Sequence, residues 1–332
     1  MSTLSSSDIL QFLSGRRDSE LFAQADAEKT RVFGRDIFLR GIVEFSNHCR
    51  NRCQYCGLRA PNTELTRYRI SRDDILLATR SIADMGLGTV VLQSGDDFHF
   101  SAEEIGGIIR QIKAERDIAV TLSLGDRSRE EFALWRDCGA DRYLLKIETT
   151  ALDLFRRCRP GARFDERLRR IESLQELGYE VGSGIITGLP GMTHTILAQD
   201  ILQLSKMGLD MIAAGPFVPH PQTPFANEAP GDVDESNRVT ALLRLLNPGT
   251  NIPATSALDA LRPGSRIAAL KMGCNVVMPS FTPQSVRAAY NIYPGKNMIP
   301  SPALQIVESV RSAISELGLV PSTSQGFSRR NA

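Results

Sequence analysis

Three cysteines near residue 50 are the side chains of this sequence best suited to bind a metal. Cys49, Cys53 and Cys56 follow a C-x₃-C-x₂-C spacing within one short segment. Three thiolates can bind three irons of a 4Fe–4S cluster and leave the fourth iron open, whereas electron-transfer clusters usually bind all four irons through cysteine. Zinc is the alternative, but a structural zinc site needs four N or S ligands, and His48 is poorly placed to join its neighbour Cys49. The spacing therefore favours an iron–sulfur cluster with one open iron.

The remaining cysteines and the N-terminus indicate a reducing compartment. Six cysteines in 332 residues are too few for a disulfide scaffold. Cys138, Cys158 and Cys274 stand alone, so we expect them to pack in the core. The N-terminus lacks the basic and apolar regions of a secretory signal, and no apolar run reaches the roughly 18–20 residues that span a bilayer. We expect a cytoplasmic protein with no membrane partner.

Composition and charge exclude several classes of protein. Hydrophobic residues make up 42% and charged residues 23% of the chain, which is ordinary for a globular protein and excludes a disordered one. The 39 Lys and Arg nearly balance the 38 Asp and Glu, leaving a net charge of +1. This balance gives no reason to expect a nucleic acid as partner.

From Gly41 onward, short apolar runs alternate with longer amphipathic segments, as in repeated βα units. Strands are expected at 41–46, 88–93, 118–124, 142–147, 181–187, 209–215, 251–255 and 274–278. Helices are expected at 7–35, 72–86, 101–115, 128–138, 165–177, 193–206, 234–246 and 263–272. Capping residues such as Ser71, Ser101 and Ser128, each followed by acidic residues, support these helix starts.

Eight βα units match an α/β fold of the (β/α)₈ TIM-barrel type in number and length. A doubly wound open sheet is the alternative, but it does not need eight strands. We predict a barrel domain at 37–310, an N-terminal helical extension at 1–36 and a C-terminal tail at 311–332 that frays from Pro321. In either architecture the functional groups lie after the carboxyl ends of the strands. The cysteine triplet follows the first expected strand and therefore lies at that end.

These features together resemble the radical S-adenosylmethionine (SAM) superfamily, whose signature is C-x₃-C-x₂-C with an aromatic residue, here Tyr55, before the last cysteine. The resemblance implies one 4Fe–4S cluster bound by Cys49, Cys53 and Cys56. It also implies that the open iron chelates the amino and carboxylate groups of SAM. Reduction would then cleave the sulfonium C–S bond to a 5′-deoxyadenosyl radical, in a cavity that excludes water.

The same resemblance implies which residues contact SAM. Ser94 begins a Ser-Gly-Asp-Asp turn at the position of the superfamily's Gly-Gly-Glu-like motif, which holds the methionine amino group. Glu148 would accept hydrogen bonds from ribose hydroxyls or an ammonium group. Arg167 would bind the carboxylate, since a guanidinium can do so with two hydrogen bonds. The segment 184–190, read as Gly-x₃-Gly-x-Pro, would flank the adenine.

Residues from about 20 to 300 also resemble the HydE family of FeFe-hydrogenase maturases, in the biotin-synthase-like group. The matching segments are 44–47, 55–59, 92–95, 139–145, 148–149, 188–191, 215–217, 219–221, 223–224, 251–255 and 293–296. This resemblance implies a small-molecule substrate, an iron complex carrying carbon monoxide, cyanide and cysteine, in the barrel cavity. It implies the maturases HydG and HydF as partners, and reduced ferredoxin or flavodoxin as electron donor. The implied cavity residues are Gln93, Thr121, Lys146, Met211, Thr255, Ser256, Met278, Tyr290 and Tyr293.

Three departures from the family pattern bear on the substrate. Lys146-Ile147 stands where the family reads Arg-His, and lysine lacks the planar fork of arginine. Ser256 stands where a second threonine is common, and no cysteine follows Cys274, so we expect a single cluster. Two other functions remain open: a methylornithine-synthase-like enzyme that acts on an amino acid, and a non-catalytic iron–sulfur or zinc-binding protein.

Overall fold

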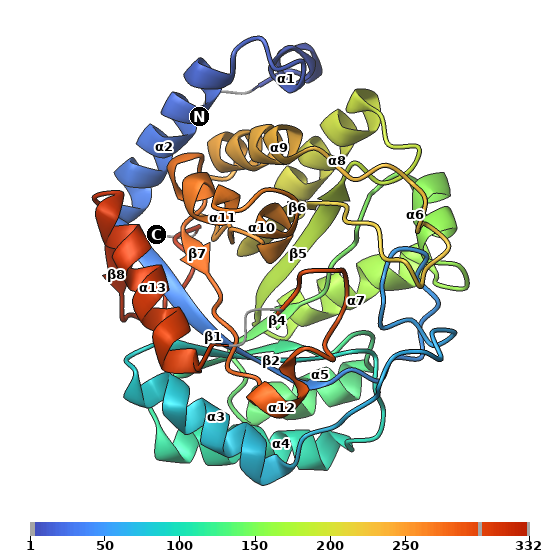
Figure 1. Cartoon of the computed structure of the whole chain (residues 1–332), viewed down its shortest axis with the longest axis vertical. Coiled ribbons are helices and arrows are strands. Elements are labelled where there is room, and N and C mark those ends of the chain that lie inside the picture. Colours follow the sequence, from blue (N-terminus) through green and yellow to red (C-terminus); the bar gives the residue numbers. More distant parts are fainter. Residues whose placement is uncertain (1–3, 298–300, 331–332) are drawn as a thin grey trace.

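The computed structural model describes residues 4–297 and 301–330, which fold around one parallel β-sheet (Figure 1). Seven strands follow the order β6-β5-β4-β3-β2-β1-β7, and β8 pairs with β1. The strands are β1 Asp36–Ser46, β2 Thr89–Ser94, β3 Ala119–Ser123, β4 Arg142–Leu144, β5 Glu180–Thr187, β6 Met211–Pro216, β7 Val276–Val277 and β8 Val320–Ser322. Because successive strands are parallel neighbours joined by helices, the expected α/β barrel architecture is confirmed.

The segment predicted as the seventh strand, 251–255, is present only as two isolated bridges. Asn251 pairs with Met211 of β6, and Pro253 pairs with Val276 of β7, both in parallel. These bridges link the two ends of the sheet and bring β6 and β7 into one ring. Pro253 has no N–H to donate to a ladder, which limits regular strand pairing in this segment.

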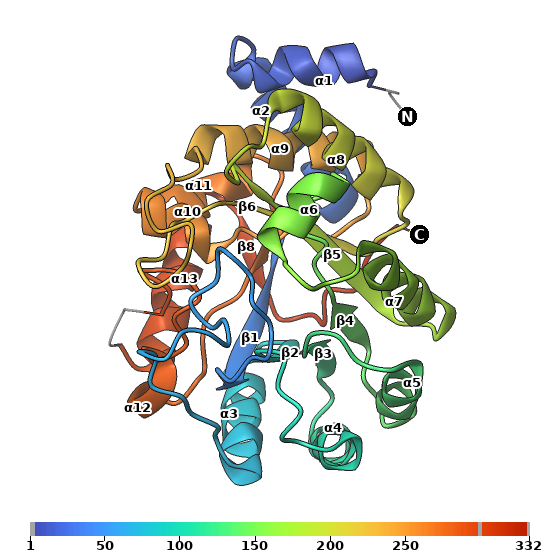
Figure 2. The ribbon, with the colours of Figure 1, turned by 90° about the vertical axis from the view of Figure 1, so that its right-hand side faces the viewer.

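Most of the helices that follow the strands cover the outside of the sheet (Figure 2). The helices after β1 are α3 Arg72–Asp84, α4 Ala102–Glu115, α5 Arg129–Asp137, α6 Leu152–Cys158, α7 Phe164–Glu176, α8 His194–Lys206, α9 Val233–Leu246, α10 Ser256–Leu261, α11 Ser265–Ala268, a 3₁₀ turn Ala269–Lys271, α12 Gln284–Arg287 and α13 Ala303–Glu316. Ser71, Ser101 and Ser128 form capping boxes, as predicted. In the described part of the chain, no helix combines the length and apolar character needed to cross a membrane.

The N-terminal residues expected to be helical at 7–35 form two helices, α1 Ser6–Leu13 and α2 Asp18–Phe33. The break falls at Gly15, whose φ of 79° is left-handed and therefore suits glycine. Helix α2 packs on α9, and α1 packs on α8 and α9 (Figures 1 and 2). The N-terminal helices thus cover the outer helices of the barrel rather than its cavity.

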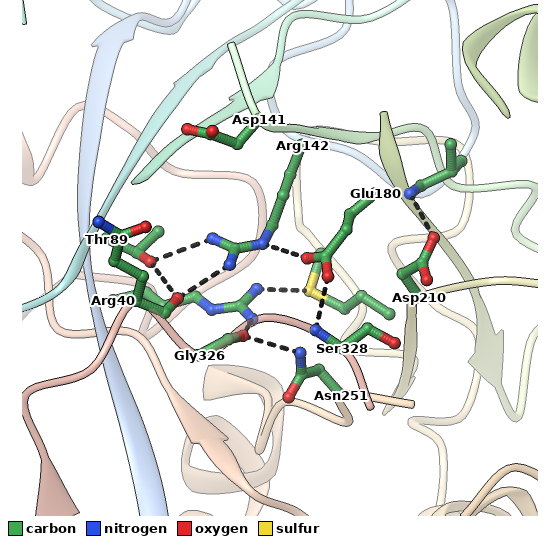
Figure 3. A network of polar contacts seen from close by, with 12 residues as sticks. Arg40, Thr89, Asp141, Arg142, Glu180, Asp210, Asn251, Gly326 and Ser328 are labelled. Atoms are coloured by element: carbon green, nitrogen blue, oxygen red, sulfur yellow. Dashed lines mark hydrogen bonds and ion pairs between the residues drawn. The ribbon is translucent and has the colours of Figure 1, made fainter. Parts of the chain in front are cut away.

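The C-terminal residues close the amino-terminal end of the barrel (Figure 3). Arg40 Nη2 and Asn251 Nδ2 both donate to the Gly326 carbonyl, each at 3.0 Å. Arg142 Nη2 donates to the Gln325 carbonyl at 2.9 Å. The buried guanidinium groups need acceptors, and the backbone of the tail supplies them.

The predicted fraying from Pro321 is therefore wrong. Strand β8, Val320–Ser322, pairs with the amino end of β1, and the residues after it lie across the barrel floor. Helix α13 also runs through residue 310, where we expected the barrel to give way to the tail. Hydrogen bonding to residues far away in the sequence orders this segment, and local sequence carries no signal of such bonds.

Candidate functional site

A cavity of about 340 Å³ lies within the barrel at the carboxyl ends of the strands. Fourteen of the fifteen residues that the sequence singled out line this one cavity. They are Cys49, Cys53, Cys56, Gln93, Ser94, Lys146, Glu148, Arg167, Met211, Thr255, Ser256, Met278, Tyr290 and Tyr293. The cavity is therefore where the structure brings the candidate chemistry together.

Thr121 is the one candidate outside this lining. It lies on β3 in register with Arg142 of β4, near the barrel floor. The residue is fully buried, and its Oγ1 has no hydrogen-bond partner among the described residues. Thr121 lies closer to the amino end of its strand than the cavity does. The motif match did not indicate how far along the strand a residue lies.

The cysteines lie on the loop that leaves β1, and three separate segments hold this loop in place. The Asp96 N–H donates to Cys49 Sγ at 3.4 Å, and the Gln54 N–H donates to the Cys158 carbonyl at 2.8 Å. The Gly57 N–H donates to the Ile292 carbonyl at 3.0 Å. Because these contacts come from different parts of the barrel, the complete fold positions the three thiols.

A single arginine also ties the loop together from within. Arg67 Nη1 donates to the carbonyls of Asn47 and Leu58 at 2.6 and 2.9 Å. Its Nη2 donates to the carbonyls of Arg59 and Asn62 at 2.8 and 3.1 Å. One side chain thus satisfies four backbone acceptors on both sides of the cysteines, which keeps an irregular loop ordered.

The donor set fits an iron–sulfur cluster. Burial raises the pKa of the Cys49 thiol, and burial with the neighbouring Cys53 and Cys49 raises that of Cys56. Positive iron would offset this cost of ionisation, since a coordinating thiol is deprotonated. Within residues 4–297 and 301–330, no three His, Cys, Asp or Glu side chains converge on the position of a single ion. A 4Fe–4S cluster does not require such convergence, because each thiolate binds a different iron.

The Ser-Gly-Asp-Asp turn after β2 packs directly on the cysteine loop. A Cβ on Gly95 would lie 2.1 Å from the His48 carbonyl oxygen, so only glycine permits this approach. Asp97 accepts hydrogen bonds from Ser46 Oγ at 2.6 Å and from Arg69 Nε at 2.7 Å. Burial alone would raise the pKa of Asp97, but the bonds from Arg69, Ser46 and the His99 N–H lower it to about 2. Asp97 is therefore an ionised link between the two loops.

Glu148 has a backbone conformation that is unusual for a residue with a side chain. Its φ is 71°, in the left-handed region, and such strain is often found at functional sites. Hydrogen bonds to β5 hold it: the Glu148 N–H donates to the Gly184 carbonyl at 2.9 Å, and its carbonyl accepts from the Ile186 N–H at 3.0 Å. The buried Asp200 accepts from Thr150 N–H at 2.6 Å and so fixes the next turn.

Charged side chains surround the Glu148 carboxylate. Lys146 Nζ lies 3.1 Å from Glu148 Oε2, and Arg159 Nη1 lies 3.9 Å from Oε1. Burial opposes ionisation of Glu148, but Lys146 and Arg159 outweigh it and lower the pKa of the carboxyl. Glu148 therefore faces the cavity as an anion that can accept hydrogen bonds from hydroxyl groups.

Sequence reasoning missed Arg159 and its partner Asp126. Arg159 caps the C-terminus of α6, is 6% exposed and lines the cavity. Its guanidinium also lies 3.8 Å from Asp126, which follows β3. Their positions in the sequence could have indicated both residues. Asp126 follows the expected strand at 118–124, where functional groups gather. Arg159 precedes Pro160, which limits further helix and so places Arg159 at a helix end.

A C-terminal segment, residues 290–297, covers one side of the cavity. Tyr290 Oη accepts from Gln93 Nε2 at 2.8 Å, and Tyr293 Oη shares a hydrogen bond of 2.6 Å with Ser256 Oγ. Lys296 Nζ lies 3.2 Å from Oε1 of Glu44, which is fully buried. These contacts join the segment to β1, to the end of β2 and to the start of α10.

A parallel barrel that carries three cysteines on its first loop, beside a charged cavity, is the architecture of radical SAM proteins. The model of the Radical SAM superfamily matches residues 43–202. The chain is 42% identical over 310 residues to the FeFe hydrogenase maturase subunit HydE of Thermotoga maritima, covering 93% of this chain and 89% of that protein. It therefore belongs to the radical SAM superfamily and, within it, to the HydE family.

More distant relatives share the fold. The 3-methylornithine synthase of Methanosarcina barkeri is 28% identical, over 80% of this chain and 75% of that protein. The crystal structure of methylornithine synthase superposes with a TM-score of 0.87 at 23% identity, covering 97% of this chain and 95% of that one. The maturase HydG from Carboxydothermus hydrogenoformans superposes with a TM-score of 0.80 at 22% identity, covering 97% and 76%. At these identities the structural matches bear on the fold alone.

Proposed function

We propose that this protein cleaves SAM reductively and serves, as HydE does, in the maturation of FeFe-hydrogenase. The observation that carries the proposal is the 42% identity with a HydE maturase over 93% of the chain. The gathering of fourteen candidate residues around one cavity supports it. The proposed substrate is a cysteine-bound iron complex with carbon monoxide and cyanide ligands, and the proposed partners are HydG, HydF and a reduced ferredoxin or flavodoxin.

Different residues of the chain would bind the cluster, orient SAM and exclude water. Cys49, Cys53 and Cys56 would hold a 4Fe–4S cluster, which with SAM supplies a 5′-deoxyadenosyl radical. Ser94 and Glu148 would orient SAM through its amino group and ribose, and Arg167 would bind its carboxylate. The apolar walls of the cavity, which include Met211 and Met278, would exclude water, which keeps reactive species from side reactions.

Anaerobic reconstitution with iron and sulfide tests the radical SAM part of the proposal. We expect a bound cluster whose spectrum changes on adding SAM, and 5′-deoxyadenosine after reduction with dithionite. Cys53→Ala should lose both the cluster and the product. Cys138→Ala is the matched control, because Cys138 is buried against α4, where Arg110 donates to it, and does not line the cavity. A colourless protein after reconstitution, or a cluster spectrum that does not change when SAM is added, would overturn the radical SAM assignment.

A maturation assay tests the HydE role. Reconstituted protein should replace HydE in a mixture that contains HydG, HydF and apo-hydrogenase, and hydrogen evolution should follow. SAM cleavage without hydrogenase activation would leave the superfamily chemistry intact and reject the HydE role.

A second candidate is an enzyme like methylornithine synthase, supported by the 28% identical relative that covers 80% of the chain. Lys146-Ile147 departs from the HydE pattern at the cavity, which is why a second substrate class is worth testing. Mass spectrometry of the reduced enzyme with SAM and free amino acids distinguishes it. Formation of a rearranged amino acid, and no hydrogenase activation, would favour this second function.

A further inference from the structure

The charged side chains around the three cysteines are positive. Residues 48–63 contain Arg50, Arg52 and Arg59 and no acidic residue, although the whole chain has a net charge of only +1. Arg50 and Arg52 are exposed. Within residues 4–297 and 301–330, no hydrogen bond or ion pair involves the Arg52 side chain. The cysteine loop therefore presents to solvent a positive charge that the fold does not use.

An aromatic side chain is exposed beside this loop. Phe98 is 49% exposed, and the guanidinium groups of Arg50 and Arg127 lie 4.0 and 3.8 Å from its ring centroid. These two cation–π contacts hold an apolar ring at the surface. Among the described residues, one other phenylalanine is exposed to a similar degree, Phe327 of the C-terminal tail. Aromatic side chains and arginine are enriched where proteins bind one another.

The turn that carries Phe98 contacts a cysteine of the candidate cluster site. The Asp96 N–H donates to Cys49 Sγ at 3.4 Å, and the Arg50 N–H donates to the Asp96 carbonyl at 3.1 Å. Asp96 is only 4% exposed, and its carboxylate lies 3.2 Å from Arg50 Nε. The acidic group is thus buried, whereas the arginine and the ring face solvent. Phe98 follows the donor to Cys49 by two residues, so this surface adjoins a proposed cluster ligand.

These features fit a protein that delivers electrons. Reductive cleavage of SAM consumes one electron, and electrons cross protein only over short distances, so their carrier must dock near the cysteine loop. Ferredoxins are small acidic carriers, and transient redox complexes use small interfaces in which charge steers the encounter. The thiolates lie behind this surface, and iron bound to them would offset their charge. An approaching acidic protein would therefore meet the arginines.

We propose that Arg50, Arg52 and Phe98, here called the donor patch, form the docking surface for an acidic ferredoxin. One electron passes from the ferredoxin, which is oxidised, to the cluster, which is reduced, and no bond forms or breaks at the patch. Arg50 and Arg52 steer the encounter, and Phe98 fills the centre of the contact. The buried Arg127 positions the ring. This inference rests on the proposed radical SAM function.

The test measures how fast two carriers of opposite charge reduce the cluster of the anaerobically reconstituted protein. Reduced ferredoxin is an anion and the methyl viologen radical is a cation, and rapid-freeze EPR spectroscopy distinguishes the reduced cluster from both. Arg52→Glu should slow reduction by ferredoxin about 3- to 10-fold at low ionic strength, and about 0.5 M salt should largely remove this effect. Reduction by the viologen should be unchanged or faster, because the reversed charge attracts a cation.

Two matched controls locate the effect. Arg16→Glu reverses another exposed arginine whose side chain has no hydrogen bond or ion pair among the described residues, in the turn between α1 and α2, and should leave both rates unchanged. Phe98→Ala should slow ferredoxin about 3- to 10-fold even in salt, as expected for an aromatic side chain at the centre of an interface. Phe327→Ala should not, although its ring also contacts a guanidinium, that of Arg142 at 4.3 Å.

Unchanged rates with ferredoxin in Arg52→Glu and Phe98→Ala would overturn the proposal. Equal slowing of both carriers by Arg52→Glu would also reject it, because the variant would then have altered the cluster and not the docking surface. Reduction of the wild-type cluster by the viologen or by a flavodoxin, but not by ferredoxin, would reject the partner. If the wild type binds no cluster, the proposed function fails first. If both carriers reduce its cluster and only the variants depart from expectation, the function stands and this inference alone fails.

Discussion

Asp97 shows how a single buried carboxylate joins two loops at the cavity. It accepts hydrogen bonds from Ser46 at the end of β1 and from Arg69 beyond the cysteine loop. An ionised carboxylate with charged and hydroxyl donors binds them more strongly than a neutral group would. The geometry of the cysteine loop thus depends on the protonation state of one side chain outside it.

Asp97 should make stability depend on pH in an acidic window. Its folded pKa, about 2, lies below the ordinary value of 3.8, so the unfolded chain binds more protons between these values. The stabilisation is therefore complete above about pH 4 and is lost as the pH falls toward 2. The shift corresponds to about 2 kcal/mol. Urea unfolding from pH 2 to 6 should show a step of this size that Asp97→Asn removes, and an unchanged profile in the variant would contradict the expectation.

At the scale of elements, two loops from neighbouring strands meet with no space between them. The loop after β2 approaches the cysteine loop at Gly95, and the segment before Ile292 approaches it at Gly57, where a Cβ would lie 2.2 Å from the Asn291 carbonyl oxygen. Backbone contact on both sides leaves no room for a side chain at Gly95 or Gly57. The close packing explains why small residues flank the candidate cluster site.

Gly95→Ala should displace the cysteine loop. The added methyl group would meet the His48 carbonyl and Cys49 Cβ, at 2.1 and 2.8 Å, so the loop must move. We expect iron per protein after reconstitution to fall at least by half and the free energy of unfolding to fall by about 1–3 kcal/mol. Gly107→Ala is the control, since a methyl group there finds no atom nearer than 4.0 Å and α4 gains a better helix former. Equal iron content in the two variants would contradict this account.

At the scale of the whole molecule, the two ends of the barrel serve different purposes. The carboxyl end holds the cavity, and the C-terminal tail closes the amino end through its backbone carbonyls (Figure 3). Arg40 connects the two, because Nη2 donates to Gly326 of the tail and Nη1 lies 3.3 Å from the sulfur of Met211, a residue of the cavity wall. The tail therefore contacts, through Arg40, a residue that lines the cavity.

Removing the tail should destabilise the protein. A chain that ends at Thr323 would leave Arg40, Arg142 and Asn251 without their carbonyl acceptors. Each buried donor left unsatisfied costs about 1–3 kcal/mol, so we expect a loss of at least about 3 kcal/mol in chemical unfolding. Ser324→Ala is the control because it keeps every tail carbonyl, and its effect should stay within about 0.5 kcal/mol. A truncated protein as stable as the wild type would show that the tail bonds contribute nothing.

The sequence by itself determined the features that depend on short separations along the chain. The capping serines such as Ser71 and Ser101 predicted helix starts that the structure confirms. The alternation of apolar and amphipathic segments predicted β1 to β7 but not β8, and it predicted a regular strand at 251–255 where only isolated bridges form. The order of motifs also placed fourteen of fifteen candidate residues in one cavity. Helix and strand propensity and the spacing of ligand residues depend on residues close together in the sequence, so they can be predicted without knowledge of the tertiary structure.

Only the tertiary structure decided which charges meet. Arg159 is an ordinary basic residue in the sequence, and only the fold buries it at 3.9 Å from Glu148 and 3.8 Å from Asp126. Arg167 matched the motif, and the fold shows that its nitrogens donate to the Lys146 carbonyl and to Asp126. The burial of a charged side chain and the partners it bonds to depend on elements that are distant in the sequence. These contacts form only when the barrel brings those elements together.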